Sequence, residues 1–260
     1  DATASGVDQP VRLAVRSMRA GTRLHDVSLE LRAGEVLGLV ALEGQGQDEL
    51  YGVLSGSRRP DAGQLLVDDR EMRFGHPADA IRAGLVYVPA NRVDALLMQR
   101  SVRENIALPF SAAWRKWGPI DRSSEGSKVD QAVDKLQIDK RAQSEVRRLS
   151  GGNQQKVTIA RWVAHGIRTL LCFDPTRGID IRTKHEIYRL MRELAATGAA
   201  VLLYTSELEE VQLVCDRVVV IFNGRVVDEM PSAVADEPTL VRAAYGLPRE
   251  MISTSPGAPA

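Results

Sequence analysis

Residues 149–156 carry the side chains in this chain that are best suited to chemistry, and they spell LSGGNQQK. Ser150 is a favoured N-cap residue, and Gly151 and Gly152 follow it directly. A serine and glycines that open a helix leave backbone N–H groups exposed where the helix dipole places partial positive charge. Such a helix end binds phosphate, so the stretch predicts a phosphate-binding site. A plain Ser-capped helix with a flexible entry is the alternative for the bare Ser-Gly-Gly.

A second stretch, EGQGQDEL at residues 43–50, directly follows an apolar run at residues 36–42. Strand, glycine-rich loop and helix together are the context of a phosphate-binding P-loop. Gly44 and Gly46 allow a tight loop whose backbone N–H groups point inward. A strand–helix turn with no nucleotide role is the alternative.

The P-loop pattern is broken at the positions that would bind phosphate and Mg²⁺. Gln47 stands where the phosphate-binding lysine belongs, and Asp48 and Glu49 take the Ser/Thr positions, one of which would hold Mg²⁺. A unit charge pair about 4 Å apart is worth roughly 1 to 4 kcal/mol. Losing the lysine and adding carboxylates therefore predicts a loop that binds nucleotide weakly or not at all.

The full string LSGGNQQK, followed by Ala160 and Arg161, resembles the signature motif of ABC-type ATPases. The resemblance covers residues 11–246 and places the family's motifs in the right order, with only the signature complete. The strings PTRGID at 175–180 and SEL at 206–208 add a closer likeness. With the signature, they resemble the C-terminal, second and degenerate ATPase domain of monosaccharide (ribose, galactose or xylose) importers.

The resemblance assigns roles to further residues. Asp174 takes the place of the glutamate that acts as general base; the alternative is a carboxylate that only caps the following turn. Ser206 replaces the switch histidine, and Asp180 lies in a loop that couples two sites across a dimer. Phe173 and Ala90 stand where the family has Mg²⁺-holding side chains, so no metal ligand is expected. The expected nucleotide-binding residues are Gly44, Gly46, Gln47, Asp48 and Glu49 in the degenerate P-loop, Ser150, Gly151, Gly152, Asn153 and Gln154 in the signature, acting in trans, and Asp180.

The elements that position these residues are predicted from hydrophobic periodicity. Alternation predicts half-exposed strands at 11–17 and 27–31, and the continuous run at 36–42 predicts a buried central strand. Further strands are predicted at 63–68, 85–88, 169–173, 199–204, 216–222 and 225–228, and helices at 77–83, 128–136 and 183–196. The resemblance implies an α/β fold: a P-loop NTPase core of the ABC ATPase type, with an N-terminal antiparallel β subdomain and a helical subdomain.

One ABC-type ATPase domain is expected over residues 11–246, with a linker or disordered segment at 1–10 and a disordered tail at 247–260. The helical subdomain is expected at about 93–150, where residues 101–104 resemble a capping box. Trp114, Trp117 and Ile120 are expected to pack this subdomain or to dock on a membrane partner. The chain does not begin with Met, so we expect a piece of a longer polypeptide, although processing would look the same.

Composition excludes several classes of protein. Lys+Arg and Asp+Glu are both 34, and this zero net charge, without a basic run, disfavours a nucleic-acid role. The longest apolar runs, such as residues 218–222, are far too short to span a bilayer. Cys172 and Cys215 lack metal-ligand spacing and lie in apolar runs, which indicates buried reduced thiols and suits the cytoplasm.

The resemblance implies the ATP-binding domain of a sugar ABC importer, which couples ATP binding and hydrolysis to transport. Its signature completes the ATP site of a second ABC ATPase domain, expected in the N-terminal half of the same polypeptide. ATP and Mg are therefore expected mainly at that partner's site, and the isolated domain is expected to be a weak or inactive ATPase.

Further expected partners are membrane permease subunits at the cytoplasmic face of the cell membrane and, indirectly, a periplasmic or extracellular sugar-binding protein. A nucleoside importer is the near alternative. A self-sufficient ATPase, in which Arg92 or Lys156 replaces the missing lysine, and a nucleotide-free interaction domain are the alternatives from other classes.

Overall fold

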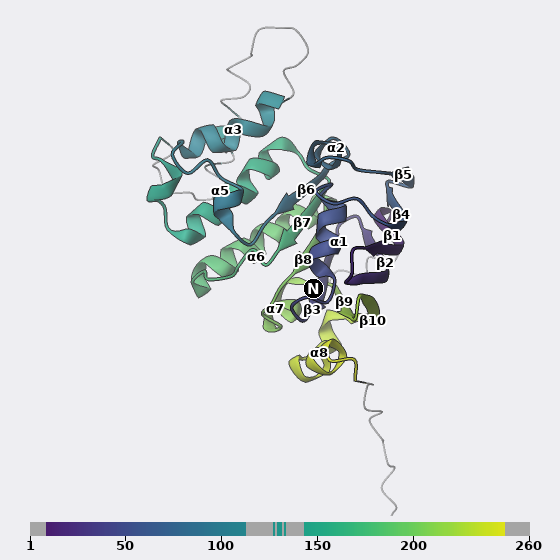
Figure 1. Ribbon diagram of the computed structural model, residues 1–260. Coiled ribbons are helices and arrows are strands. Elements are labelled where there is room, and N and C mark those ends of the chain that lie inside the picture. Colours follow the sequence, from purple (N-terminus) through teal and green to yellow (C-terminus); the bar gives the residue numbers. More distant parts are fainter. Residues whose placement is uncertain (1–8, 113–126, 128, 132, 134–142, 248–260) are drawn as a thin grey trace, which may run out of the picture.

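The computed structural model describes residues 9–112, 127, 129–131, 133 and 143–247. The strands are β1 (Val11–Ala20), β2 (Leu24–Arg32), β3 (Val36–Ala41), β4 (Ala62–Val67), β5 (Arg70–Met72), β6 (Leu85–Val88), β7 (Thr169–Phe173), β8 (Ala200–Tyr204), β9 (Arg217–Phe222) and β10 (Arg225–Pro231). The helices are α1 (Gln47–Leu54), α2 (Pro77–Arg82), α3 (Val102–Ala112), α5 (Gly151–His165), α6 (Ile181–Ala196), α7 (Glu209–Val214) and α8 (Glu237–Ala244), with 3-10 turns η2 (Arg92–Asp94), η4 (Val146–Arg148) and η5 (Ser232–Val234). The strands form a ten-stranded sheet in the order β5-β4-β1-β2-β10-β9-β3-β8-β7-β6 (Figure 1).

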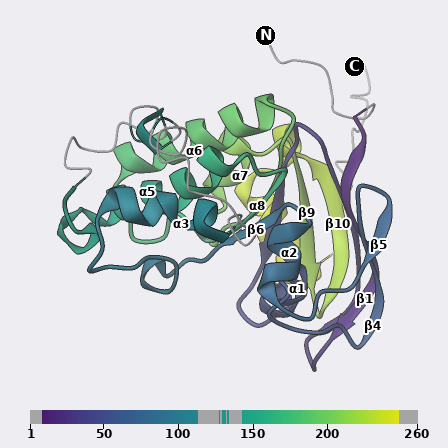
Figure 2. The same cartoon turned by 90° about the horizontal axis from the view of Figure 1, so that it is seen from above.

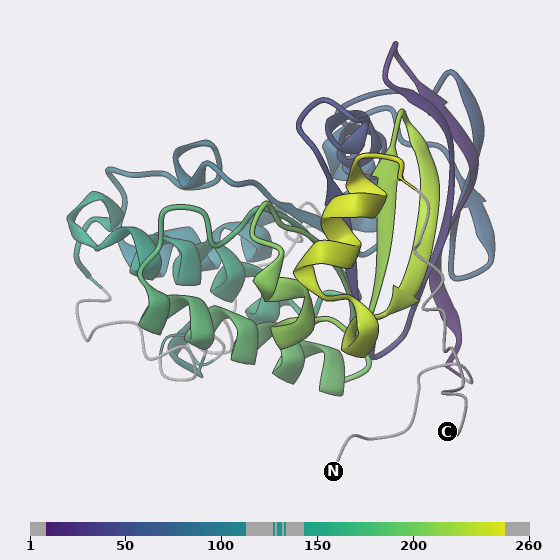
Figure 3. The same ribbon diagram turned by 90° about the horizontal axis from the view of Figure 1, so that it is seen from below.

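The centre of the sheet is parallel and buried. β3 pairs in parallel with β8 and β9, and β7 pairs in parallel with β6 and β8. Every residue of β3 and β8 is buried, as expected of strands that are covered on both faces. One face is covered by α5, α6, α7 and α8 through an apolar cluster that includes Ile159, Ile187, Val211 and Leu240. Figure 3 shows α8, in yellow, lying against β9.

The other face of the parallel strands meets α1 and an antiparallel layer. β1 pairs antiparallel with β2 and β4, and β4 with β5. Figure 2 shows this layer at one end of the molecule and α3 and α5 at the other. Tyr51 on α1 is buried, and its hydroxyl donates to the backbone oxygens of Cys172 and Leu202 at 3.0 and 3.1 Å. This bond joins α1 to β7 and β8, two strands whose carboxyl ends carry motif residues.

This arrangement confirms the α/β class predicted from the sequence. The predicted capping box at the start of α3 is also confirmed: Glu104 N–H donates to Ser101 Oγ at 3.1 Å, and Ser101 N–H donates to the Glu104 carboxylate at 2.8 Å. Asn223 and Gly224 both have positive φ in the β9–β10 turn, as a type I′ turn requires. Cys172 and Cys215 are buried free thiols, as expected.

Two details differ from the sequence predictions, and one group of predictions is not tested. Residues 95–101 are not helical, because the side chain of Asn105 accepts from Leu97 N–H at 2.8 Å and donates to Leu97 O at 3.0 Å, which holds a loop ahead of α3. The short elements β5 and α7 were not predicted, since neither is long enough to show a period. Trp114, Trp117, Ile120 and most of the helix predicted at 128–136 lie outside the described residues.

Within the described ranges, no helix is long and apolar enough to cross a membrane. In the same part of the chain, no group of His, Cys, Asp and Glu side chains is arranged to hold a metal ion.

Candidate functional site

The signature stretch opens α5 as the sequence predicts. Ser150 has extended backbone geometry and is the N-cap, with its Oγ accepting from Asn153 N–H at 3.4 Å. Gln154 is buried, and its side-chain amide donates to Val146 O and Leu149 O, each at 3.2 Å. Gln154 therefore holds the loop before α5 in place, and its side-chain amide is used in hydrogen bonds to that loop. The backbone N–H groups of the first turn lie at the positive end of the helix dipole, which favours anions.

Close packing requires glycine at Gly152, whereas at Gly151 the nearest group is the movable end of an arginine side chain. A Cβ at Gly151 would lie 2.6 Å from Arg92 Nη2, and a Cβ at Gly152 would lie 2.4 Å from Thr183 Cγ2. Thr183 in turn donates its N–H and its hydroxyl to the Asp180 carboxylate at 3.0 and 2.9 Å, so Asp180 is the N-cap of α6. The signature and the coupling loop are thus in contact through Thr183.

The glycine-rich loop is closed by its own side chains. Gln47 is 1% exposed, and its Oε1 accepts from Gln45 N–H at 2.9 Å. The Gln45 side chain accepts from Asn223 N–H at 2.6 Å, which ties the loop to the β9–β10 turn. Gly46 has φ 103°, and a Cβ there would lie 2.8 Å from Arg23 O. The Gln47 side-chain amide therefore bonds to the backbone of the loop that precedes it.

Carboxylates surround the start of α1. Burial and, after it, the charge of Glu49 raise the pKa of Asp48 above its ordinary value. Glu49 is buried; one of its oxygens lies 3.9 Å from Arg58 Nη1, and the other has no hydrogen-bond partner among the residues that the structure describes. The guanidinium of Arg23 lies beside Gly44, where a Cβ would come within 2.7 Å of Nη1. Arg23 lies in the β1–β2 turn, and no local pattern in the sequence marks it.

A hollow of 450 Å³ lies at the carboxyl ends of β3, β7 and β8, where open α/β sheets bind ligands. Gln47, Asp48, Asp174 and Ser206 line it, so the structure brings these predicted site residues together. The rings of Phe173 and Tyr204 also reach this hollow, with their centroids 4.5 Å apart. No signature residue lines it, and α5 lies apart from α1 in both Figure 1 and Figure 2.

Asp174 is buried at the edge of this hollow. Its φ is 47°, and its carboxylate accepts from the hydroxyl of Ser206 at 3.0 and 3.1 Å and from Ser206 N–H at 3.2 Å. The positions that the family resemblance assigns to the general base and to the switch are therefore bonded to each other.

The two cations suggested as substitutes for the lysine lie elsewhere. Lys156 is buried and pairs with Glu186, and Arg92 lies against Gly151. Neither residue lines the hollow. The structure therefore brings no support to the self-sufficient ATPase through these residues.

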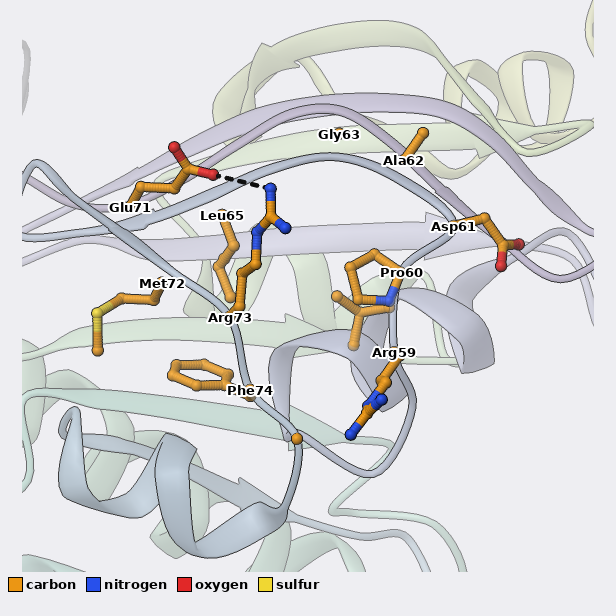
Figure 4. Close-up of a pocket in the computed structure, with 12 residues that line it drawn as sticks. Arg59, Pro60, Asp61, Ala62, Gly63, Leu65, Glu71, Met72, Arg73 and Phe74 are labelled. Atoms are coloured by element: carbon orange, nitrogen blue, oxygen red, sulfur yellow. Dashed lines mark ion pairs between the residues drawn. The ribbon is translucent and has the colours of Figure 1, made fainter.

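A separate hollow of 390 Å³ lies in the antiparallel layer (Figure 4). Arg59, Asp61 and an Arg73–Glu71 ion pair of 3.6 Å surround its apolar floor. None of the predicted site residues lines it, so it is distinct from the nucleotide motifs.

The fold, the glycine-rich loop before α1 and the signature at the start of α5 define a nucleotide-binding α/β domain of the P-loop class. The chain belongs to the ABC transporter family, whose model matches residues 24–177. It is an ABC transporter ATP-binding domain.

Similar proteins are ribose import ATP-binding proteins. The chain is 41% identical to RbsA 1 of Mesorhizobium japonicum over 254 residues, which is 96% of this chain and 49% of that protein. It is 41% identical to RbsA 2 of Streptomyces avermitilis over 238 residues, 91% of this chain and 47% of that protein. The chain thus spans about half the length of the curated relatives it matches.

Solved structures share the fold. The ADP conformation of MJ1267, an ATP-binding cassette of an ABC transporter, has a TM-score of 0.74 at 21% identity and covers 90% of this chain and 95% of its own. The cbiO1 protein of Clostridium perfringens, part of the cbiONQ transporter complex, has a TM-score of 0.77 at 22% identity, with 90% and 94% covered. The α/β P-loop NTPase fold is therefore that of ABC ATPase cassettes.

Proposed function

We propose that this chain is the second, C-terminal ATPase domain of a sugar importer ATPase, and that its signature completes the ATP site of the other domain. The observation that carries the proposal is a contrast between the signature at the start of α5 and the glycine-rich loop before α1. The signature keeps its serine cap and both glycines, whereas the glycine-rich loop has a neutral amide, Gln47, hydrogen-bonded inside the loop.

Mg-ATP does not fit the chain's own loop. The triphosphate would lose the lysine charge and meet Asp48 and Glu43, which line the hollow together with a cation, Arg177. Phe173 and Ala90 occupy positions at which the family resemblance places Mg²⁺-holding side chains, and neither has an oxygen ligand in its side chain. A repulsion of a few kcal/mol costs orders of magnitude in affinity. ATP and Mg are therefore assigned to the partner domain's site.

In this proposal, the chain supplies hydrogen-bond donors to the nucleotide that the partner domain holds. Ser150 caps α5, and we assign Ser150 and the first N–H groups of this helix to the γ-phosphate held by a partner domain, with added attraction from the helix dipole. Donors that are fixed before the reaction stabilise developing charge without reorganisation. Asp180 and Thr183 hold the next helix against this surface, which suits Asp180 for the coupling role.

The substrate class is assigned from the relatives. Those named above are ribose import proteins, so a monosaccharide is the proposed cargo of the transporter, with a nucleoside as the alternative. The proposed partners are the first ABC ATPase domain, the membrane permease subunits and, indirectly, an external sugar-binding protein. The proposed location is the cytoplasmic face of the membrane.

A permease contact is proposed over about residues 95–120. In the described part of this segment and just before it, Leu97 and Val93 are exposed at 51% and 58%. Apolar side chains on a surface loop favour burial by a partner.

Signature variants of the two-domain ATPase test the proposal. Ser150→Ala is expected to lower ATP hydrolysis by about tenfold or more, since a lost donor to developing charge costs on that order. Asp48→Asn, a matched change in the degenerate loop, is expected to leave hydrolysis unchanged within about twofold. Unchanged hydrolysis in the Ser150 variant would support the nucleotide-free interaction domain instead.

A further inference from the structure

The buried carboxylate of Glu210, on α7, is contacted by hydrogen-bond donors from three other parts of the fold. Glu210 is 2% exposed. The hydroxyls of Thr176 and Thr205 donate to it at 2.7 Å each, and the hydroxyl of Tyr188 donates to the same group. The ammonium of Lys184 lies 3.6 Å away. A buried carboxylate bonded by this many donors fixes its neighbours, because breaking any one bond leaves charge unsatisfied.

The donors come from segments that carry motif residues. Thr176 follows β7 in the loop that ends at Asp180, and Thr205 follows β8 directly before Ser206. Tyr188 lies on α6, whose first turn contacts the signature through Thr183. Glu210 therefore links the loop after β7, the loop after β8 and α6 in one hydrogen-bonded group.

We propose that Glu210 is a positioning residue for the signature. By holding α6 and the two loops in one arrangement, it fixes the first turn of α6 against Gly152. The proposal rests on the proposed function, in which the signature acts on nucleotide held by the partner domain. Without Glu210, the nucleotide still binds to the partner's own loop, but the donors of α5 are no longer held at the γ-phosphate. The turnover number is therefore expected to fall while the KM for ATP changes little.

The test compares Glu210→Gln with Glu207→Gln in the two-domain ATPase. Glu207 is a matched control because it pairs with the same Lys184 but its side chain is 46% exposed. We expect kcat to fall about tenfold in Glu210→Gln, with KM within about twofold, and both to stay near wild type in Glu207→Gln. Tyr188→Phe removes one donor and keeps the ring, so it is expected to give a smaller kcat loss in the same direction.

Hydrogen exchange on this chain supplies a second readout. Faster exchange confined to residues 174–184, 205–207 and the signature at 150–154 is expected in Glu210→Gln, with β3 and α1 unchanged. Uniformly faster exchange, or equal kcat in the two glutamate variants, would overturn the proposal. If Glu210→Gln does not fold, an unchanged kcat in Tyr188→Phe overturns it. An active Ser150→Ala enzyme is a failure of the proposed function, whereas an inactive Ser150→Ala with an active Glu210→Gln is a failure of this proposal alone.

Discussion

The hydroxyl of Ser206 donates to the carboxylate of Asp174, lying 3.0 and 3.1 Å from its two oxygens. The backbone N–H of Ser206 donates to the same carboxylate at 3.2 Å. In the family resemblance, these residues stand at the positions of the general base and the switch histidine. Here the two residues are hydrogen-bonded to each other, which ties the end of β7 to the end of β8 and suits a structural role for both.

Ser206→Ala is predicted to lower the free energy of unfolding by about 1–2 kcal/mol, because the buried Asp174 carboxylate loses a hydroxyl donor. Urea denaturation measures the change. Ser206→Thr keeps the hydroxyl and is the matched control, expected to retain most of the stability. Equal losses in the two variants would show that the hydroxyl is not what stabilises Asp174.

Gly152→Ala is predicted to destabilise the chain by about 1–3 kcal/mol, because the added methyl overpacks the start of α5. The methyl would lie 2.4 Å from Thr183 Cγ2, in the first turn of α6. Gly75→Ala is the control, since a Cβ there meets nothing closer than 3.6 Å. Thermal unfolding of both variants checks the prediction, and similar melting temperatures would contradict it.

Glu186→Gln is predicted to destabilise the chain by about 3 kcal/mol, because it leaves the buried ammonium of Lys156 without its partner. Lys156→Met, which removes the charge and keeps the apolar stem, is expected to cost less. Neither change is expected to alter the response of the isolated chain to Mg-ATP in calorimetry. If Lys156→Met changed nucleotide binding, the result would favour the self-sufficient ATPase, in which Lys156 replaces the missing lysine.

Asp180 is predicted to give a pH-dependent contribution to stability. Hydrogen bonds from Thr183 lower the pKa of Asp180 below its ordinary value of 3.8. A carboxyl group with a lower pKa in the folded state stabilises the fold above the unfolded-state pKa, and this stabilisation is lost as the pH falls through the folded pKa. The melting temperatures of wild type and Asp180→Ala should therefore differ at pH 7 and converge in acid.

Asp180→Asn keeps a helix cap without the charge and serves as the control for this titration. The difference in melting temperature between Asp180→Asn and wild type is expected to shrink in acid, since both residues are then neutral. A constant difference between wild type and Asp180→Ala at every pH would show that the Asp180 charge does not contribute.

The sequence predicted most of the fold because the central strands are apolar runs and α6 has a clear helical period. It did not predict the loop at 95–101, since that loop depends on Asn105 side-chain bonds to Leu97, which no periodicity reveals. The short β5 and α7 were missed for a similar reason: tertiary contacts define them more than local pattern does.

The motif residues could be located from sequence, but their partners could not. Ser150 is a cap that local chemistry predicted, whereas the capping of α6 by Asp180 was not predicted. The contacts of Gly151 with Arg92 and of Gly152 with Thr183 join segments far apart in the chain. The same holds for Glu210, whose donors come from separate elements.

The central claim is that this chain's own loop does not hold nucleotide, and calorimetric titration of the chain with Mg-ATP tests it most directly. The account predicts no detectable binding by wild type. It also predicts recovered binding in Gln47→Lys, because Gly44 and Gly46 keep the loop shape and the lysine restores the lost charge. Wild-type binding with a Kd below about 1 μM, or about −8 kcal/mol, would contradict the account. It would show that another group replaces the missing lysine.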